Sequence, residues 1–470
     1  MKAGHAIRRA AAPAVLFMLA VPVTQAFAHA ADRGFVMLLP TGYYMWSGAA
    51  AVAASFLVLA LVPPRPLDRL AGRRLRLASI GVDGRFATSL ISFLAFAGLL
   101  AAGMWGSRDP LSNPLPLIIW TVWWVGLTLL CGLLGNLWRW LDPWYAPWRV
   151  AAAILRIAPE RPPLSLPVSA EYWLAIAFFA GFAWFELVYP APDDPERLAI
   201  AAGVYWCISF AGSLLFGHSV WTSRAECFSV FFAMIARLSP FERAGSRLSL
   251  LLPGAKLADA EPLPVSGALF LLLALSTVSF DGLMRTFFWL GRIGVNPLEF
   301  PGRSAVMGSS TAGLVLAFAL LAAAFFTAIW LGGRLAGDAP PGAAGRLVWS
   351  IIPISLAYHF SHYLVSLAVD GQYALAAISD PFVLGWNLFG TAGYHVSAAV
   401  AVGYDSAWII WNLQAAAIVG GHVLAVAVAH LIAWRLYGDV RRAALSQLPL
   451  ALLMVAYTVL GLWLLSSPTA

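Results

Sequence analysis

Charged side chains are scarce in this sequence. Asp, Glu, Lys and Arg make up only 11% of its 470 residues, whereas hydrophobic residues make up 61%. Soluble domains are about one quarter charged. No soluble fold could hide so much apolar surface from water, so lipid must cover a large part of it. The composition therefore predicts an all-α protein, a polytopic bundle of transmembrane helices.

Cysteines are equally few. Cys131, Cys207 and Cys227 all lie in apolar runs, and their spacing matches no metal-binding or redox motif. Cysteine is often buried as a small hydrophobic residue. We therefore expect structural thiols and no disulfide framework.

Nucleic-acid-binding patterns are absent, although the net charge is +7. No RNP, zinc-finger or helix-turn-helix pattern is present. The arginines stand instead in short segments between apolar runs, as in PRPLDRLAGRRLRLAS, residues 64–79. Cytoplasmic loops of membrane proteins carry such an excess of basic residues. This distribution favours membrane lipid as the partner and argues against nucleic acid.

The first 28 residues have the pattern of a secretory signal peptide. Lys2, Arg8 and Arg9 form a basic start, residues 10–23 form a short apolar stretch, and Ala-Phe-Ala ending at Ala28 resembles a cleavage site. Cleavage would leave a single polytopic membrane domain. We expect it in a bacterial inner membrane.

The mature chain, 29–470, would then begin at His29 on the periplasmic side. A free amino group beside an imidazole can chelate copper. His29 and His395, expected on the same side of the membrane, therefore suggest one alternative function, metal handling, in which they collect copper outside and histidines within the membrane pass it inward.

Ten stretches are long and apolar enough to cross a bilayer, which takes roughly 20 residues. They are residues 42–63, 88–105, 116–137, 171–189, 198–217, 265–282, 308–332, 348–369, 406–436 and 445–466. Starting outside, these crossings place the arginine-rich segments inside. The assignment requires that residues 219–238, which contain Arg224 and Glu226, form a re-entrant or interfacial helix. Residues 145–157 are expected to form another interfacial helix.

Two histidines occur near the middle of the eighth predicted span. His359 and His362 are separated by about 300° around a helix, so they lie about 60° apart on one face. His422 lies on the next span, after Gly420 and Gly421, which would allow another helix to approach closely. Three neutral imidazoles could bind zinc, copper or iron with a position left for water. Hydrogen bonding between helices and proton relay are the alternatives.

A second polar group is predicted at the outer side. Asp281 and Arg285 end one span, and Asp370 and Gln372 end the span that carries the histidines. The long loop that follows adds further polar and aromatic residues, Asp380, Trp386, Asn387 and His395. Such a loop would either line an outward-facing pocket or pack over the end of the bundle. His218 and His430 are expected to be structural.

Several stretches together resemble a known family. They are FAWFELVYP at 182–190, RAECFSVFFAMIARLSP at 224–240, SFDG at 279–282, HYLVSLAVDGQ at 362–372, SDPFVLGWNLFGT at 379–391 and QLPLALLMVAYTVLGLWLLS at 447–466. The chain resembles the fenitrothion hydrolase-like integral membrane proteins of bacteria over most of its length. The resemblance implies hydrolysis of an organophosphorus triester at the P–O-aryl bond. The resemblance carries over no catalytic residue, and the catalytic candidates in this sequence are Asp281 and Glu226.

For such a hydrolysis, a metal ion held by His359, His362 and His422 would lower the pKa of bound water. The resulting hydroxide would attack phosphorus in a small apolar substrate. A transporter is the alternative, with the same histidines carrying protons. That alternative predicts repeated halves, and the sequence contains no clear internal repeat.

Overall fold

Ten long apolar helices dominate the computed structural model, which describes residues 41–79, 81, 84–158, 160–397 and 403–469. Nine of the ten spans begin and end within five residues of the predicted bounds, and the other, Ala343–Ala377, extends beyond the predicted 348–369 at both ends. The predicted all-α polytopic bundle is therefore confirmed, and the chain is a multi-pass membrane protein. The predicted signal peptide and His29 lie outside the described residues.

Seven of the ten spans are single α-helices and three are composite. The single helices are α3 (Thr41–Leu61), α5 (Arg85–Trp105), α11 (Pro195–Phe216), α15 (Val265–Met284), α17 (Arg303–Leu335), α20 (Tyr404–Tyr437) and α21 (Val440–Ser466). The composite spans are α6, η2 and α7 (Pro114–Pro116, Leu117–Leu127, Thr128–Leu134), η3 and α10 (Val168–Ala170, Trp173–Leu187), and α18, η5 and α19 (Ala343–Leu347, Val348–Ile351, Ile352–Ala377). Within them, η2 is a π-helix.

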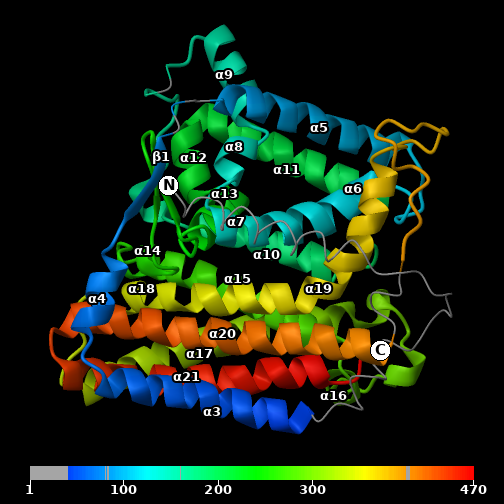
Figure 1. Ribbon diagram of the computed structural model, residues 1–470. Helices are drawn as coiled ribbons and strands as arrows, with labels where there is room; N and C mark the ends of the chain where they lie inside the picture. Colours follow the sequence, from blue (N-terminus) through cyan, green and yellow to red (C-terminus); the bar gives the residue numbers. More distant parts are fainter. Residues whose placement is uncertain (1–40, 80, 82–83, 159, 398–402, 470) are drawn as a thin grey trace, which may run out of the picture.

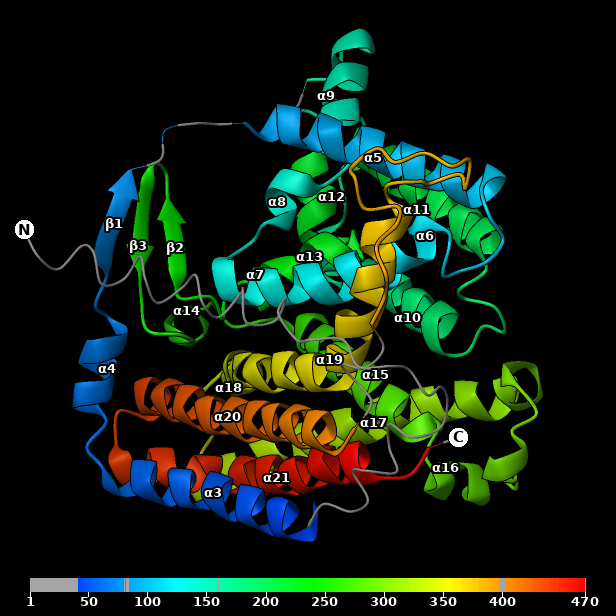
Figure 2. The same cartoon turned by 45° about the vertical axis from the view of Figure 1, so that its right-hand side comes forward.

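Shorter helices connect the spans. They are α4 (Arg65–Ala71), α8 (Trp138–Leu141), α9 (Tyr145–Ile154), α12 (His218–Arg224), α13 (Cys227–Ile235), α14 (Ala255–Ala258), α16 (Phe287–Arg292) and the 3₁₀ turn η4 (Pro297–Glu299). The region 219–238 thus folds as two short helices, neither of which is among the ten span candidates. α13 is buried inside the protein, which fits a re-entrant helix better than an interfacial one. α9 runs across α5 (Figure 2).

A three-stranded sheet was not predicted from the sequence. β1 (Leu75–Ser79) pairs antiparallel with β3 (Arg247–Leu250), which pairs antiparallel with β2 (Phe241–Ala244). Gly245, with φ of +60°, opens the two-residue turn between β2 and β3, where a positive φ favours glycine. The sheet lies beside the ends of the helices, at the left of Figure 2. The alternation of leucine with polar residues in β1 and β3 is the signal for it.

The helices form two groups (Figures 1 and 2). The first group contains α5 to α13, which are contiguous in the chain, and the second contains α3, α15, α17, α20 and α21. α19 packs against α20 of the second group and against η2 of the first, and α15 packs against α10. The junction of the two groups therefore brings α10, η2, α15 and α19 together.

An ionic network ties the sheet to the second group. Arg74 pairs with Glu242 at 2.9 Å and with Asp259 at 3.4 Å, while Arg435 pairs with Asp68 at 2.8 Å and with Asp259 at 2.7 Å. All of these side chains are at least partly exposed, so each pair contributes little alone. Together they join α4, α14 and the end of α20 on the side predicted to face the cytoplasm.

Candidate functional site

Tyr363 connects two acidic side chains at the junction of the helix groups. Its hydroxyl oxygen lies 3.0 Å from Oε1 of Glu186 and 2.8 Å from Oδ2 of Asp281. Glu186 comes from the end of α10, Asp281 from the end of α15, and Tyr363 from the middle of α19. The three side chains therefore hold three spans together by polar contacts.

The geometry around Tyr363 requires an additional proton. A phenol carries one hydrogen and cannot donate to two ionised carboxylates at once. Oε2 of Glu186 is buried without a hydrogen-bond partner among the described residues, and an ionised carboxylate so placed would be costly. Asp281, in contrast, has a second donor in His362. Both hydrogen bonds of the Tyr363 hydroxyl can form when Glu186 is the protonated acid. Glu186 then donates to Tyr363, and Tyr363 donates to Asp281.

His362 is held by Asp281 through one ring nitrogen. Nε2 of His362 lies 2.7 Å from Oδ2 of Asp281, and the side chains are 26% and 13% exposed. A carboxylate accepts, so this contact assigns the ring hydrogen to Nε2. Nδ1 has no hydrogen-bond partner within the described part of the chain. The pair therefore leaves Nδ1 of the ring without a protein partner, a position that suits a general base.

Arg303 links the start of α17 to the end of α10. Its Nη1 atom donates to the backbone carbonyl of Glu186 at 2.7 Å. The contact satisfies a carbonyl near the end of α10, where helix carbonyls lack partners within the helix. Arg303 thereby fixes the end of α10 that carries Glu186.

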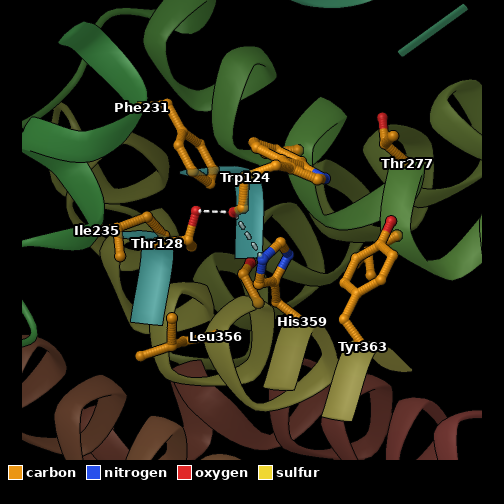
Figure 3. Close-up of a pocket in the computed structure, with 11 residues that line it drawn as sticks. Trp124, Thr128, Phe231, Ile235, Thr277, Leu356, His359 and Tyr363 are labelled. Carbon is orange, nitrogen blue, oxygen red and sulfur yellow. Dashed lines mark hydrogen bonds between the residues drawn. The ribbon is translucent and has the colours of Figure 1, made fainter. Parts of the chain in front are cut away.

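His359 faces a different region, inside the bundle. Its Nε2 atom donates to the carbonyl of Trp124 at 3.1 Å, and the hydroxyl of Thr128 donates to the same carbonyl at 2.5 Å (Figure 3). Trp124 lies on the π-helix η2, a form of helix that is frequent at functional sites. His359 and Tyr363 border a cavity of about 20 Å³. A space of this size holds about one water molecule, so an organic substrate does not fit there.

His422 lies apart from both. Its Nδ1 atom donates to the carbonyl of Ile418 at 2.8 Å, and its Nε2 atom is buried without a partner among the described residues. The ring packs against Tyr358, with centroids 6.1 Å apart. Among the residues described, no group of three or more His, Cys, Asp or Glu side chains is placed to hold a metal ion. The predicted meeting of His359, His362 and His422 at one point is therefore wrong.

The physical reason is the position of each ring relative to neighbouring helices. His359 and His362 do share one side of α19, as their spacing predicts. Different groups face the two rings, however. His359 contacts the carbonyl of Trp124, whereas His362 contacts the carboxylate of Asp281. Of the two glycines predicted to permit close helix approach, Gly421 does so and Gly420 does not. A Cβ at Gly421 would lie 2.5 Å from Cβ of Ala357 on α19, whereas a Cβ at Gly420 would meet no atom within 4 Å.

Glu226 forms a network separate from that of Asp281. It precedes α13 and caps it: Oε1 accepts from the N–H of Phe228 at 3.0 Å, and Oε2 from the N–H of Ser229 at 2.6 Å. The hydroxyl of Tyr205 donates to Oε1 at 2.5 Å. Burial raises the pKa of Glu226, and these hydrogen bonds oppose that effect. The contacts assign a structural role to a residue that the sequence suggested as catalytic.

Polar residues of the outer loop mainly hold the loop itself. Asp380 accepts from the backbone N–H groups of Leu384 and Gly385, both at 2.8 Å. Gln372 bonds the backbone of Ser397 through both ends of its amide. His395 is exposed, and its Nδ1 atom donates to the carbonyl of Gly393.

Sequence reasoning missed Glu186, Tyr363, Trp124 and Arg303. Glu186 could have been found, because an acidic residue within an apolar span is rare and faces the interior. Tyr363 directly follows His362, but a tyrosine in a span is ordinarily interpreted as packing. The role of the Trp124 carbonyl depends on the π-helix, for which the sequence has no signal.

No protein-family model, no curated protein and no solved structure matches this chain. The family resemblance therefore stays a prediction, and the function is argued from the site.

Proposed function

We propose that this chain is a membrane-embedded hydrolase in which His362 is the general base. The observation that carries the proposal is the contact between His362 and Asp281, which holds the ring hydrogen on Nε2 and leaves Nδ1 free. Asp281 would also stabilise the imidazolium that forms when Nδ1 accepts a proton. An acid and a histidine so paired are the usual means of activating water or a hydroxyl group.

The proposed substrates are small, neutral organophosphorus triesters, a class taken from the resemblance. Nδ1 of His362 takes a proton from water, and the hydroxide attacks phosphorus. The new P–O bond forms as the P–O-aryl bond breaks, and the nitrophenolate leaves with the bond electrons. Nitrophenolate is a stable anion, so no acid is needed at the leaving oxygen. The imidazolium then returns its proton to solvent.

The test is nitrophenol release from a dialkyl 4-nitrophenyl phosphate by the purified full-length protein. Replacing His362 with alanine is expected to lower turnover about 10²- to 10⁴-fold, the usual contribution of a general base. His395→Ala is the matched control, because His395 is exposed on the outer loop and contacts only that loop. Equal turnover of the His362→Ala variant and the parent protein would refute the proposal.

Proton-coupled transport is the second candidate. The observation that favours it is the chain of hydrogen bonds from Glu186 through Tyr363 to Asp281 inside the bundle. Glu186→Gln separates the two functions, because a glutamine remains neutral and can still donate to Tyr363. The hydrolase is expected to keep its turnover in this variant. A transporter that loads and releases the Glu186 proton would lose proton-coupled uptake in proteoliposomes.

We also propose that the chain resides in a bacterial inner membrane with its mature N-terminus in the periplasm. The ten spans and the arginine-rich connections support this orientation. It places Glu186, Asp281 and the end of α21 near the outer face. Alkaline phosphatase fused after the last residue is expected to be active, and a fluorescent protein that folds only in the cytoplasm is expected to stay dark.

A further inference from the structure

A second cavity lies beside the network, at the ends of α15 and α17. Its volume is about 220 Å³ and its lining is Met284, Arg285, Leu290, Phe300, Arg303 and Val306. None of these residues borders the small cavity at His359. We call this space the outer pocket.

The size of the outer pocket suits one aromatic ring. A cavity of about 150 Å³ in a protein core is enough to bind benzene. The four apolar residues in the lining supply contacts for a ring. A dialkyl aryl triester is larger than this space, whereas a single substituted benzene fits.

Two guanidinium groups give the outer pocket its charge. Arg303 uses Nη1 on the carbonyl of Glu186 and keeps its remaining N–H groups for other partners. Arg285 is exposed and has no hydrogen bond or ion pair to any residue that the structure describes. Asp281 and Asp193 attract Arg303 from outside the pocket lining. The first residue of α17 is Arg303, so the positive end of that long helix adds to the field.

The pocket therefore combines apolar walls with two like charges that repel each other. A monoanion between the guanidinium groups would relieve the repulsion and accept charge-assisted hydrogen bonds. From this geometry we infer that the outer pocket binds a small aromatic monoanion, a carboxylate or a phenolate, with its ring against Leu290 and Phe300. This inference does not depend on the proposed hydrolysis.

The test measures binding of radiolabelled benzoate to the full-length protein in phosphatidylcholine nanodiscs by equilibrium dialysis. Saturable binding is expected for the parent protein, and Arg285→Gln is expected to weaken it about tenfold, because one charge-assisted hydrogen bond contributes that much or more. Arg303→Gln should weaken it similarly. The charge of Arg285 acts on Asp281, but Arg285 makes no hydrogen bond or ion pair to a described residue, so its variant is expected to fold even if Arg303→Gln does not.

Arg292→Gln is the matched control. Arg292 lies on α16 near the same face, stacks over Phe288 and does not line the outer pocket. Its variant is expected to bind benzoate as the parent does. Neutral nitrobenzene should bind the parent and the Arg285→Gln variant equally. Loss of benzoate binding in Arg292→Gln equal to that in Arg285→Gln would overturn the assignment, because it would indicate attraction by surface charge alone.

A lipid headgroup is another anion that could meet these arginines. The binding is therefore repeated in nanodiscs that also contain phosphatidylglycerol. Unchanged benzoate affinity is expected if the pocket serves a small soluble anion. Displacement of benzoate by phosphatidylglycerol would overturn the assignment and identify a lipid site.

Discussion

Nε2 of His362 and Oδ2 of Asp281 are 2.7 Å apart across the contact between α19 and α15. The two side chains keep part of their surface accessible, unlike His359, which is only 4% exposed. A general base must reach its substrate, so accessibility favours His362 over His359. The effect of a substitution near this pair on activity or stability depends on the contacts that the substituted residue makes.

Tyr363→Phe is expected to lower nitrophenol release about tenfold, or 1.4 kcal/mol, with the protein still folded. The change removes the hydroxyl that supports Asp281 from behind, but it leaves the contact of Asp281 with His362 intact. Tyr373→Phe on the same helix is the control, because no hydrogen bond of its hydroxyl to a described residue is present. If nitrophenol release fell as far in Tyr363→Phe as in His362→Ala, Tyr363 would take part in the reaction directly.

Gly421→Ala is expected to destabilise the protein by about 1–3 kcal/mol, the usual cost of overpacking. The added Cβ would lie 2.5 Å from Cβ of Ala357 and 2.8 Å from the carbonyl oxygen of Pro353. Gly420→Ala is the matched control, because a Cβ there meets no atom within 4 Å. Alanine favours a helix over glycine, so the control should be as stable as the parent or more so. Thermal unfolding in detergent measures both.

Asp142→Asn is expected to lower stability at neutral pH, with the loss shrinking as the pH falls. Burial raises the pKa of Asp142, but the hydrogen bond from His218 and the charge of Arg85 more than offset this, and the pKa lies below its usual range. A lowered carboxyl pKa contributes stability above the unfolded value, about 3.9, and the contribution is lost as the pH drops through the folded value.

The measurement compares melting temperatures at about pH 7 and at about pH 2, because the contribution is lost only below the unfolded value of about 3.9. Asp338→Asn serves as control, because Asp338 is exposed and no ion pair joins it to a described residue. A stability loss in Asp142→Asn that is the same at both pH values would show that packing, and not charge, is responsible.

Glu226→Ala is expected to destabilise the protein by roughly 0.5–2 kcal/mol through loss of the cap on α13. The hydroxyl of Tyr205 would also lose its acceptor. Turnover per folded molecule should stay within about twofold of the parent, far less than a general base contributes. A selective loss of turnover with unchanged melting temperature would restore Glu226 as a catalytic residue.

Chelation tests the metal ion that the sequence suggested. His359 and His422 each use one ring nitrogen on a backbone carbonyl, and His362 uses one on Asp281. Under the general-base proposal, dialysis against a chelator is expected to leave nitrophenol release unchanged. Metal analysis of the same sample supplies the stoichiometry. Loss of activity that zinc, copper or iron restores would establish the metal-assisted reaction.

The spans could be predicted from the sequence because apolar length alone determines them. The partners of each histidine could not be predicted, since they depend on how far each helix is rotated about its axis. Asp281 and His362 were both singled out, yet only the packing of α15 on α19 pairs them. Glu226 was singled out for its charge, but the break between α12 and α13 makes it a cap.

The β-sheet has a consequence for how the chain could be divided. The chain leaves the sheet at β1, forms every helix from α5 to α13, and returns to the same sheet at β2. With β3 between them, the exit and entry strands are about 10 Å apart. Residues 84–235 therefore behave as one insertion, which could be removed or replaced without rerouting the remaining spans. Such an excision would keep Asp281 and His362 together and take away Glu186, so the proposed base and the buried acid belong to separable parts of the protein.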